Sequence, residues 1–217
     1  MVPRMTDAMV EHHLRYSLAR GTEVAQHPKE QWWLTMSSQA DAKAFNATVV
    51  VGNPKPTSRT RDVGVAVARA YAHHFAIADP AIDVVELSEL SSSLFVWGAP
   101  AVEAAKQQVL GSHLVIVASP VYKASYTGLL KAFLDQFGRD ELGALATVPL
   151  MVGAGPAHSL AVESQLRPVL VEIGASCPTR GLYILESEIG DVESPIAEWM
   201  SVWGNALRAV VSCRFGA

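Results

Sequence analysis

The sequence predicts an α/β fold, a three-layer sandwich in which helices cover both faces of a five-stranded parallel sheet. From residue 46 onward, short apolar, β-branched runs alternate with longer segments of helical period. This alternation is typical of βαβ units, whose parallel strands are buried on both faces. A chain of 217 residues, half of them hydrophobic, is long enough to bury such a core. Five strands fit the order 2-1-3-4-5, in which the winding reverses between strands 1 and 3.

Each predicted strand is a short apolar run, and each predicted helix follows a 3.6-residue period. The predicted strands are residues 48–52, 82–87, 113–118, 147–152 and 181–185. The predicted helices are residues 60–75, 100–110, 128–137, 157–173 and 194–213. Pro100 and Pro195 stand in first turns, where proline is tolerated. Pro168 lies inside the fourth helical segment, so it must kink or divide that segment.

Residues 1–45 differ from the rest and form a predicted N-terminal extension, followed by one domain over residues 46–217. Residues 1–20 have a rough helical spacing that suits a short helix, residues 21–31 have no clear period, and Trp32-Trp33-Leu34 forms an isolated apolar patch. One hypothesis is that translation can begin at Met36, so that residues 1–35 are dispensable or disordered. The alternative is a genuine extension that packs against the domain or a partner through Trp32 and Trp33. The mass of the intact native protein distinguishes the two.

The charge pattern argues against a nucleic-acid partner, and the lengths of the apolar segments argue against a membrane span. The formal net charge is −4 without a basic block, whereas nucleic-acid interfaces usually have a clustered Lys/Arg face. No segment approaches the ~18 apolar residues of a membrane span, and the N-terminus lacks the apolar run of a signal peptide. We therefore expect a cytoplasmic protein. Cys177 and Cys213 have no C-x-x-C or metal-ligand spacing, so neither a disulfide framework nor a metal site is predicted.

The loop after strand 1 combines hydroxyls and a cation at the start of a helix. It reads G-N-P-K-P-T-S-R-T over residues 52–60 and lies at the switch point, where such sheets bind ligands. A helix N-terminus offers unpaired N–H groups and partial positive charge, and Ser58, Arg59 and Thr60 add groups that suit a phosphate. The G-K-[ST] ending of a nucleoside-triphosphate loop is missing. The alternative for this loop is simple helix capping.

The loops after strands 3 and 4 reach the same edge of the predicted sheet. In the first, Tyr122 and Tyr126 either wall a flat aromatic ligand or only pack, and Lys123 either favours an anionic ring or faces solvent. Thr127 is predicted to cap the following helix. The second loop contains G-x-G without a third glycine in register, which is a poor dinucleotide fingerprint. Its glycines still allow close approach to a flat group.

With these loops, the chain resembles the NAD(P)H-dependent FMN reductase family of the flavodoxin-like superfamily. It is most similar to the reductases that supply reduced FMN to sulfonate monooxygenases. The resemblance rests on residues 52–60, on S-P-V-Y-K-A-S-Y-T-G-L-L-K-A-F-L-D at 119–135, and on V-G-A-G-P-A-H-S-L-A-V-E-S-Q-L-R-P-V-L at 152–170 with P-T-R-G-L-Y after it. The chain departs from the family pattern at Asn53, Ala154 and Ser164.

The resemblance implies a flavodoxin-like fold that binds FMN at the loops described above. The residues expected to hold the phosphate are Ser58, Arg59 and Thr60. Those expected to contact the ribityl chain and isoalloxazine, mostly through their backbone, are Pro120, Val121, Tyr122 and Lys123, with Ser125 and Tyr126 bordering the pocket. Those expected to approach the pyrimidine end of the ring are Gly153, Ala154 and Gly155.

The implied activity is hydride transfer from NAD(P)H to FMN, with the reduced flavin supplied to a partner monooxygenase. Because the flavin carries the chemistry, no catalytic side chain is assigned. One alternative is an enzyme with tightly bound FMN that reduces quinones, azo dyes or metal ions. Another is an FMN electron carrier without pyridine-nucleotide activity. Such flavodoxins are usually strongly acidic, so a net charge of only −4 argues against this alternative. The resemblance also implies a homodimer or homotetramer, with the apolar helix after Gly128 as its expected interface.

Overall fold

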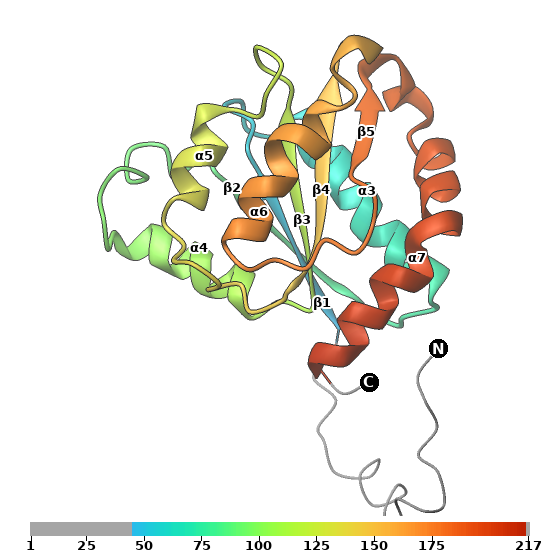
Figure 1. The fold of residues 1–217 in the computed structure, drawn as a ribbon, viewed down its shortest axis with the longest axis horizontal. Helices are drawn as coiled ribbons and strands as arrows, with labels where there is room; N and C mark the ends of the chain where they lie inside the picture. The colour runs from blue at the N-terminus through green and yellow to red at the C-terminus, as the bar shows by residue number, and fades with distance from the viewer. Residues whose placement is uncertain (1–44, 216–217) are drawn as a thin grey trace, which may run out of the picture. The chain divides into compact units, whose positions relative to one another are not determined.

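The computed structural model describes residues 45–215, and in this range it contains a five-stranded parallel sheet in the order β2-β1-β3-β4-β5 (Figure 1). The strands are β1 (Asn46–Val51), β2 (Ala81–Glu86), β3 (Leu114–Pro120), β4 (Ala146–Gly153) and β5 (Leu182–Leu185). All neighbouring strands pair in parallel. The predicted strand order is therefore confirmed, and each predicted strand lies close to its expected bounds.

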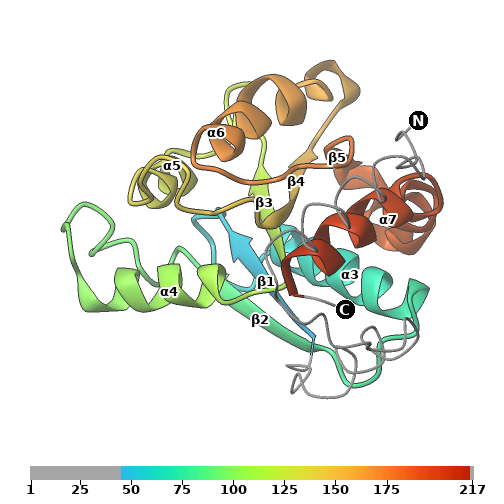
Figure 2. The ribbon, with the colours of Figure 1, turned by 60° about the horizontal axis from the view of Figure 1, so that its bottom comes forward.

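Helices cover both faces of this sheet. The helices α3 (Arg59–His74) and α7 (Glu193–Phe215) lie on one face, and α4 (Pro100–Leu110), α5 (Gly128–Leu134) and α6 (Arg167–Glu172) lie on the other (Figures 1 and 2). The core divides in the same way, because Val49 and Val51 pack with α3 and α7, whereas Val50 packs with α4 and α5. Successive side chains of a strand point to opposite faces of its sheet, so a strand that is buried on both faces contributes alternately to the two halves of the core. The predicted three-layer sandwich is confirmed.

The carboxyl ends of β1 and β2 are level with each other, and β3 continues two residues beyond them to Pro120. Val51 of β1 is in register with Glu86 of β2 and Ala118 of β3. One residue further, the Gly52 N–H donates to the Ala118 carbonyl at 2.8 Å, and the Leu87 N–H donates to the Val51 carbonyl at 3.2 Å. The loops after these three strands therefore begin side by side at the upper edge of the sheet in Figure 1.

The central strands anchor that edge. Every residue of β3 and β4 is buried, and burial of one Val, Leu or Ile side chain contributes about 1.5–3 kcal/mol relative to leaving it in water. The first residues of the loops that follow β3 and β4 are therefore held in place by the buried ends of these strands.

Pro168 divides the segment that the sequence predicts as mostly helical. A 3₁₀ turn (Pro156–His158) is followed by a π-helical turn (Val162–Leu166), and α6 begins immediately after it with Pro168 in its first turn. Proline has no N–H to donate and its ring crowds the preceding turn, so the wider π turn accommodates it without a break in the chain. The prediction that Pro168 kinks or divides this segment is confirmed.

The predictions made for residues 1–44, including the start at Met36 and packing through Trp32 and Trp33, lie outside the described residues. Over residues 45–215, no helix combines the length and the apolar character that crossing a bilayer requires.

Candidate functional site

The loops after β1 and β3 are joined by a hydrogen bond and by close packing. The Thr127 hydroxyl donates to the Gly52 carbonyl, with 2.5 Å between the oxygens, and accepts from the Leu130 N–H at 3.1 Å. Thr127 is thus the N-cap of α5, as the sequence predicts. A Cβ atom on Gly52 would lie 2.7 Å from the Leu130 Cβ, so only glycine allows this approach. The switch point therefore brings the two loops into direct contact.

The N-terminus of α3 presents donors to an anion. Ser58 is the N-cap, and its Oγ accepts from the Arg61 N–H at 3.3 Å. The N–H groups of Arg59 and Thr60 have no acceptor within residues 45–215. Two free amides at the positive end of a 16-residue helix form a suitable place for a phosphate group.

The side chains of Arg59 and Thr60 have different surroundings. Thr60 is buried, and its hydroxyl oxygen accepts from the Asn53 side-chain amide at 3.1 Å. The side-chain oxygen of Asn53, Oδ1, in turn accepts from the Lys55 N–H at 2.9 Å, so the Asn53 side chain joins two parts of the loop. The Arg59 side chain is 63% exposed and pairs with Glu186 at 3.2 Å. The sequence did not reveal Glu186, because it follows β5 and is distant along the chain.

The loop after β3 contains a tight two-residue turn. The backbones of Tyr122 and Ser125 exchange hydrogen bonds of 2.8 and 3.1 Å. Between them, Lys123 and Ala124 have φ angles of 52° and 63°, the left-handed region that a turn of this kind requires. The turn holds Tyr122 at the surface, where it is 49% exposed. Lys123 is also exposed, in agreement with the solvent-facing alternative.

The remaining predicted residues of this loop lie against the protein body. Pro120 is the buried last residue of β3, and the Val121 N–H donates to the Val152 carbonyl of β4 at 2.8 Å. Tyr126 is half-buried and packs against the core under α5. Burial raises the pKa of Tyr126, the nearby charge of Lys131 partly lowers it, and the charge of Asp135 raises it further. Tyr126 is therefore a neutral wall of the loop at physiological pH.

The glycines of the loop after β4 have unequal roles. At Gly153, a Cβ atom would lie 1.9 Å from the Tyr183 hydroxyl oxygen, so the close approach that this glycine permits is to Tyr183 of β5. The Tyr183 hydroxyl donates to the Gly155 carbonyl at 2.7 Å and fixes the loop. Ala154 is exposed, and a Cβ atom on Gly155 would meet nothing within 4 Å. Space for a ligand is thus found at Ala154 and Gly155, whereas Tyr183 occupies one side of Gly153.

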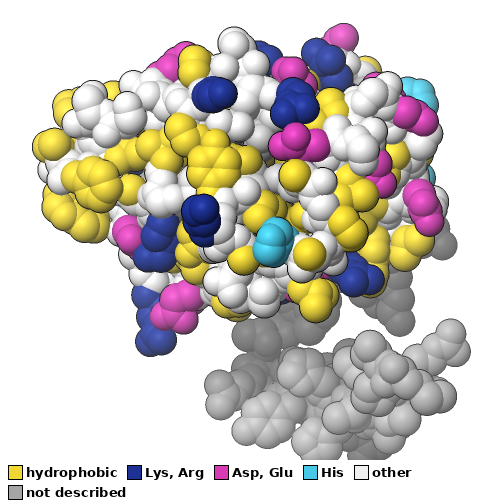
Figure 3. Space-filling view, turned by 90° about the horizontal axis from the view of Figure 1, so that it is seen from above, with side chains coloured by type: hydrophobic (Ala, Val, Ile, Leu, Met, Phe, Trp, Pro, Cys, Tyr) yellow, Lys and Arg dark blue, Asp and Glu magenta, His cyan; other side chains and the backbone are white. Residues whose placement is uncertain are grey.

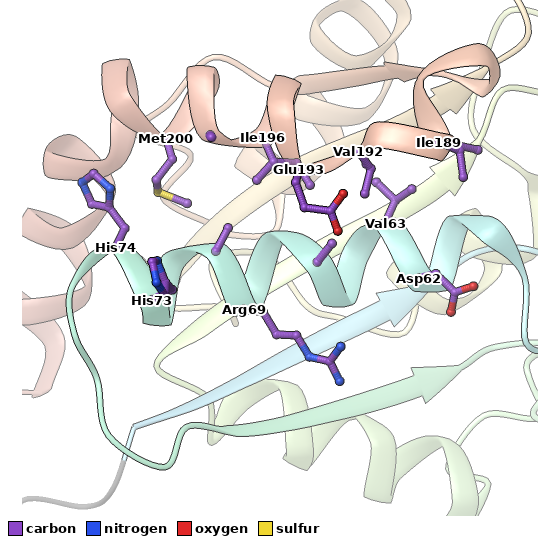
Figure 4. Close-up of a pocket in the computed structure, with 13 residues that line it drawn as sticks. Asp62, Val63, Arg69, His73, His74, Ile189, Val192, Glu193, Ile196 and Met200 are labelled. Atoms are coloured by element: carbon purple, nitrogen blue, oxygen red, sulfur yellow. The ribbon is translucent and has the colours of Figure 1, made fainter.

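A cavity of about 630 Å³ lies elsewhere, between α3 and α7 (Figure 4). Its floor includes Val63, Ile196 and Met200, and its rim carries Arg69 and Glu193. None of the site residues predicted from the sequence lines it. The predicted site is instead an open edge, part of which is seen from above in Figure 3.

A parallel sheet in this order, with a donor-rich helix N-terminus and a tyrosine-bearing loop meeting at its switch point, defines a flavodoxin-like protein. Within that class, a family model described as NADPH-dependent FMN reductase matches residues 45–188, and the chain belongs to this family. It is an NAD(P)H:FMN oxidoreductase, with FMN as its flavin and NAD(P)H as its electron donor.

Curated relatives and a solved structure agree with this assignment. The chain is 29% identical over 151 residues to NADH-dependent FMN reductase SfnE of Pseudomonas putida, which covers 68% of this chain and 80% of the relative. It is 37% identical over 95 residues to the FMN reductase (NADPH) of Escherichia coli strain K12, which covers 44% of this chain and 50% of the relative. The apo form of the NADH:FMN oxidoreductase EMOB matches with a TM-score of 0.62 and 29% identity, over 77% of this chain and 88% of that chain.

The residues at the edge fit a flavin phosphate. The free amides of Arg59 and Thr60 suit the phosphate, and Gly128 and Gly155 leave open space where a Cβ atom would meet nothing within 4 Å. Tyr122, in the loop that leads into Gly128, offers an exposed ring. This combination of an anion site and flat, open backbone matches a ring joined to a phosphate.

Proposed function

We propose that this reductase takes FMN as an exchangeable substrate and supplies the reduced flavin to a partner monooxygenase. The observation that carries the proposal is the openness of the edge, where Arg59 is 63% exposed and Tyr122 is 49% exposed. An open edge provides less burial to retain a flavin than an enclosed pocket does, which favours release. The curated relatives named above are FMN reductases, with NADH in one name and NADPH in the other.

In this proposal, each loop holds one part of FMN. The residues that hold the phosphate are Ser58, Arg59 and Thr60. The residues that line the ribityl chain and the ring are Pro120, Val121, Tyr122, Lys123, Ser125 and Tyr126. The residues at the pyrimidine end are Gly153, Ala154 and Gly155, of which the latter two have space for contact.

The chain contributes position rather than acid–base chemistry. When bound, FMN would supply the acceptor for a hydride from NAD(P)H, and solvent would supply the proton that completes the reduced flavin. The exposed ring of Tyr122 and the open space at Gly155 would leave room for the nicotinamide to stack. No side chain needs to donate or remove a proton, so no catalytic residue is proposed.

We further propose a homo-oligomer, with a different surface from the one that the sequence suggests. In α5, Leu130, Ala132, Phe133 and Leu134 are buried in the core of their own chain, which leaves little apolar surface for a partner. The loop before α4 carries exposed apolar side chains instead, with Phe95 82% and Trp97 72% exposed. Figure 3 shows apolar side chains gathered on the left of the view, the side that carries α4 and α5 in Figure 1. Exposed apolar patches of this kind mark interaction sites.

The proposed function is tested by flavin titration combined with steady-state kinetics. We expect a protein that is colourless after purification, binds added FMN reversibly, and oxidises NADH or NADPH only when FMN is added. Coupling to a flavin-dependent monooxygenase should then give product without further flavin enzyme. A yellow protein that turns over without added FMN would support the tightly bound alternative. Absence of turnover with both nicotinamides would overturn the proposal.

A further inference from the structure

Glu86 lies beside the phosphate loop, although it belongs to a different strand. It is the last residue of β2 and is in register with Val51, the last residue of β1. Its side chain is only 10% exposed. Acidic side chains are rarely buried to this degree unless they have partners, so the contacts of Glu86 are informative.

One oxygen of Glu86 contacts the chain on both sides of Ser58. The Glu86 Oε1 accepts a hydrogen bond from the Thr57 N–H at 3.2 Å and lies 3.4 Å from the Arg61 Nε. Thr57 is the last residue of the loop before the cap, and Arg61 is in the first turn of α3. The carboxylate therefore ties the loop and the helix to the end of β2.

Thr57 needs such a contact, because its backbone is strained. Its φ is +48°, in the left-handed region, where a β-branched residue is unfavourable by about 1–2 kcal/mol. Strained residues persist only where their surroundings hold them. The hydrogen bond from Thr57 to Glu86 is the contact that joins this residue to the sheet. The strain at Thr57 sets the direction in which the chain enters Ser58 and α3.

We propose that Glu86 is a positioning residue for the phosphate end of FMN, and that it acts by fixing Thr57 so that the free amides of Arg59 and Thr60 face the phosphate. This inference rests on the proposed function. In this proposal Glu86 contacts no atom of the flavin and acts only through the loop that contains Thr57. Within the same proposal, the reach of Glu86 to the Thr57 N–H matters more than its ion pair with Arg61, because Thr57 is the residue that leads into the cap.

The charges around Glu86 are consistent with a geometric role. Burial raises the pKa of Glu86, and the Thr57 N–H and Arg61 partly oppose this, whereas Glu89 and Asp62 raise the pKa further. Its Oε2 is buried and finds no hydrogen-bond partner among residues 45–215. A buried carboxylate repels a phosphate that binds beside it. Glu86 therefore helps the site only through its hydrogen bond with Thr57, and its charge works against phosphate binding.

The test compares two conservative variants that separate length from charge. Glu86→Gln keeps the reach to Thr57 and removes the charge, whereas Glu86→Asp keeps the charge and shortens the side chain. Dissociation constants for FMN and for riboflavin, which lacks the phosphate, are measured by flavin fluorescence quenching on the full chain. Asp83→Asn, an exposed acid on the same strand, is the matched control.

We expect Glu86→Asp to weaken FMN binding about tenfold, the effect of losing one hydrogen bond to a charged acceptor. Riboflavin binding should stay within about twofold of the wild type, a difference below 0.5 kcal/mol. Glu86→Gln should retain FMN affinity within about threefold, which is under 1 kcal/mol, and Asp83→Asn should change neither affinity. Equal weakening of FMN and riboflavin, or an unchanged FMN affinity in Glu86→Asp, overturns the inference. If the wild type itself does not prefer FMN to riboflavin, the proposed phosphate site fails instead.

Discussion

The Thr127 hydroxyl donates a hydrogen bond to the Gly52 carbonyl, with 2.5 Å between the two oxygens, across 75 residues of sequence. Gly52 opens the loop that leads to α3, and Thr127 caps α5. A single side chain thus fixes the distance between the expected phosphate loop and the expected ring loop. Close packing against Leu130 supports this hydrogen bond and requires a glycine at position 52, because Leu130 leaves no room for a Cβ atom.

Replacing Thr127 with valine should destabilise the fold by about 2–3 kcal/mol, since it removes the α5 cap and leaves the buried Gly52 carbonyl unpaired. Thr127→Ser keeps the hydroxyl and should lose less than about 1 kcal/mol. Urea unfolding of both variants measures the difference. Equal loss in the two variants would show that the hydroxyl contributes nothing.

Removing the charge of Glu186 should strengthen FMN binding. Glu186 pairs with Arg59 at 3.2 Å, and a phosphate at the N-terminus of α3 has to compete for the same guanidinium. An exposed pair contributes about 0.2–1 kcal/mol, so Glu186→Gln should improve FMN affinity up to about fivefold, less at high salt. Flavin titration checks this. In an Arg59→Ala background the Glu186→Gln effect should vanish, and its persistence there would contradict the competition.

Gly153 and Tyr183 should behave as a coupled pair. Gly153→Ala places a Cβ atom 1.9 Å from the Tyr183 hydroxyl oxygen and should destabilise the protein by about 1–3 kcal/mol through overpacking. In a Tyr183→Ala background the same alanine has room and should have little effect. A double-mutant cycle by urea unfolding therefore gives a coupling energy above about 1 kcal/mol. Additive losses would mean that the two residues do not meet.

The stability of the protein should decrease in acid through Glu163. Burial raises the pKa of Glu163, but hydrogen bonds from Arg167 and the Gly181 N–H, with the charges of Arg167 and Arg180, outweigh this and lower the pKa below its ordinary value of 4.5. The folded-state pKa is therefore below the unfolded one. The carboxylate stabilises the fold fully above the unfolded pKa, and this contribution is lost as the pH falls through the folded pKa.

Glu163→Gln provides the comparison for that pH dependence. The variant should be about 1–3 kcal/mol less stable than the wild type near neutral pH, since Arg167 and Gly181 lose a charged acceptor. As the pH falls from the unfolded pKa through the folded pKa of Glu163, the difference should shrink, because the wild-type carboxylate loses its charge. Chemical unfolding at a series of pH values measures both quantities. A difference that is independent of pH would exclude the ionised Glu163 as the cause.

Charged substitutions in the loop before α4 should break the proposed oligomer. The loop is held in place, because Leu94 is buried and its carbonyl accepts from the Gln136 side chain at 2.7 Å, so Phe95 and Trp97 are presented outward on a fixed base. Phe95→Glu with Trp97→Glu should shift the sedimentation coefficient to that of a smaller species. Val202→Glu, at an exposed apolar position on α7, is the control. An unchanged oligomer in the double variant contradicts this interface.

Much of the fold follows from local patterns in the sequence. The run at 48–52 is too apolar and β-branched for a surface strand. In the structure its side chains are buried alternately on the two faces of the sheet, because successive residues of a strand point to opposite faces. Pro168 had to disturb the regular α-helical hydrogen bonding, because proline lacks the donor that this pattern requires. Ser58 and Thr127 are caps because short hydroxyl side chains satisfy free amides. These features depend on neighbours along the chain, so the sequence by itself determined them, together with the loops that carry the family resemblance.

The tertiary structure decided how residues on different elements meet. Glu86 looks like an ordinary polar position at the end of a strand, and only the register of β2 against β1 places it on Thr57. Gly153 suggests space for a ligand, but the direction of the Tyr183 side chain fills one side of it. The apolar face of α5 suggests an interface, yet the sheet buries most of it. Such contacts depend on strand register and side-chain direction, which no local pattern encodes.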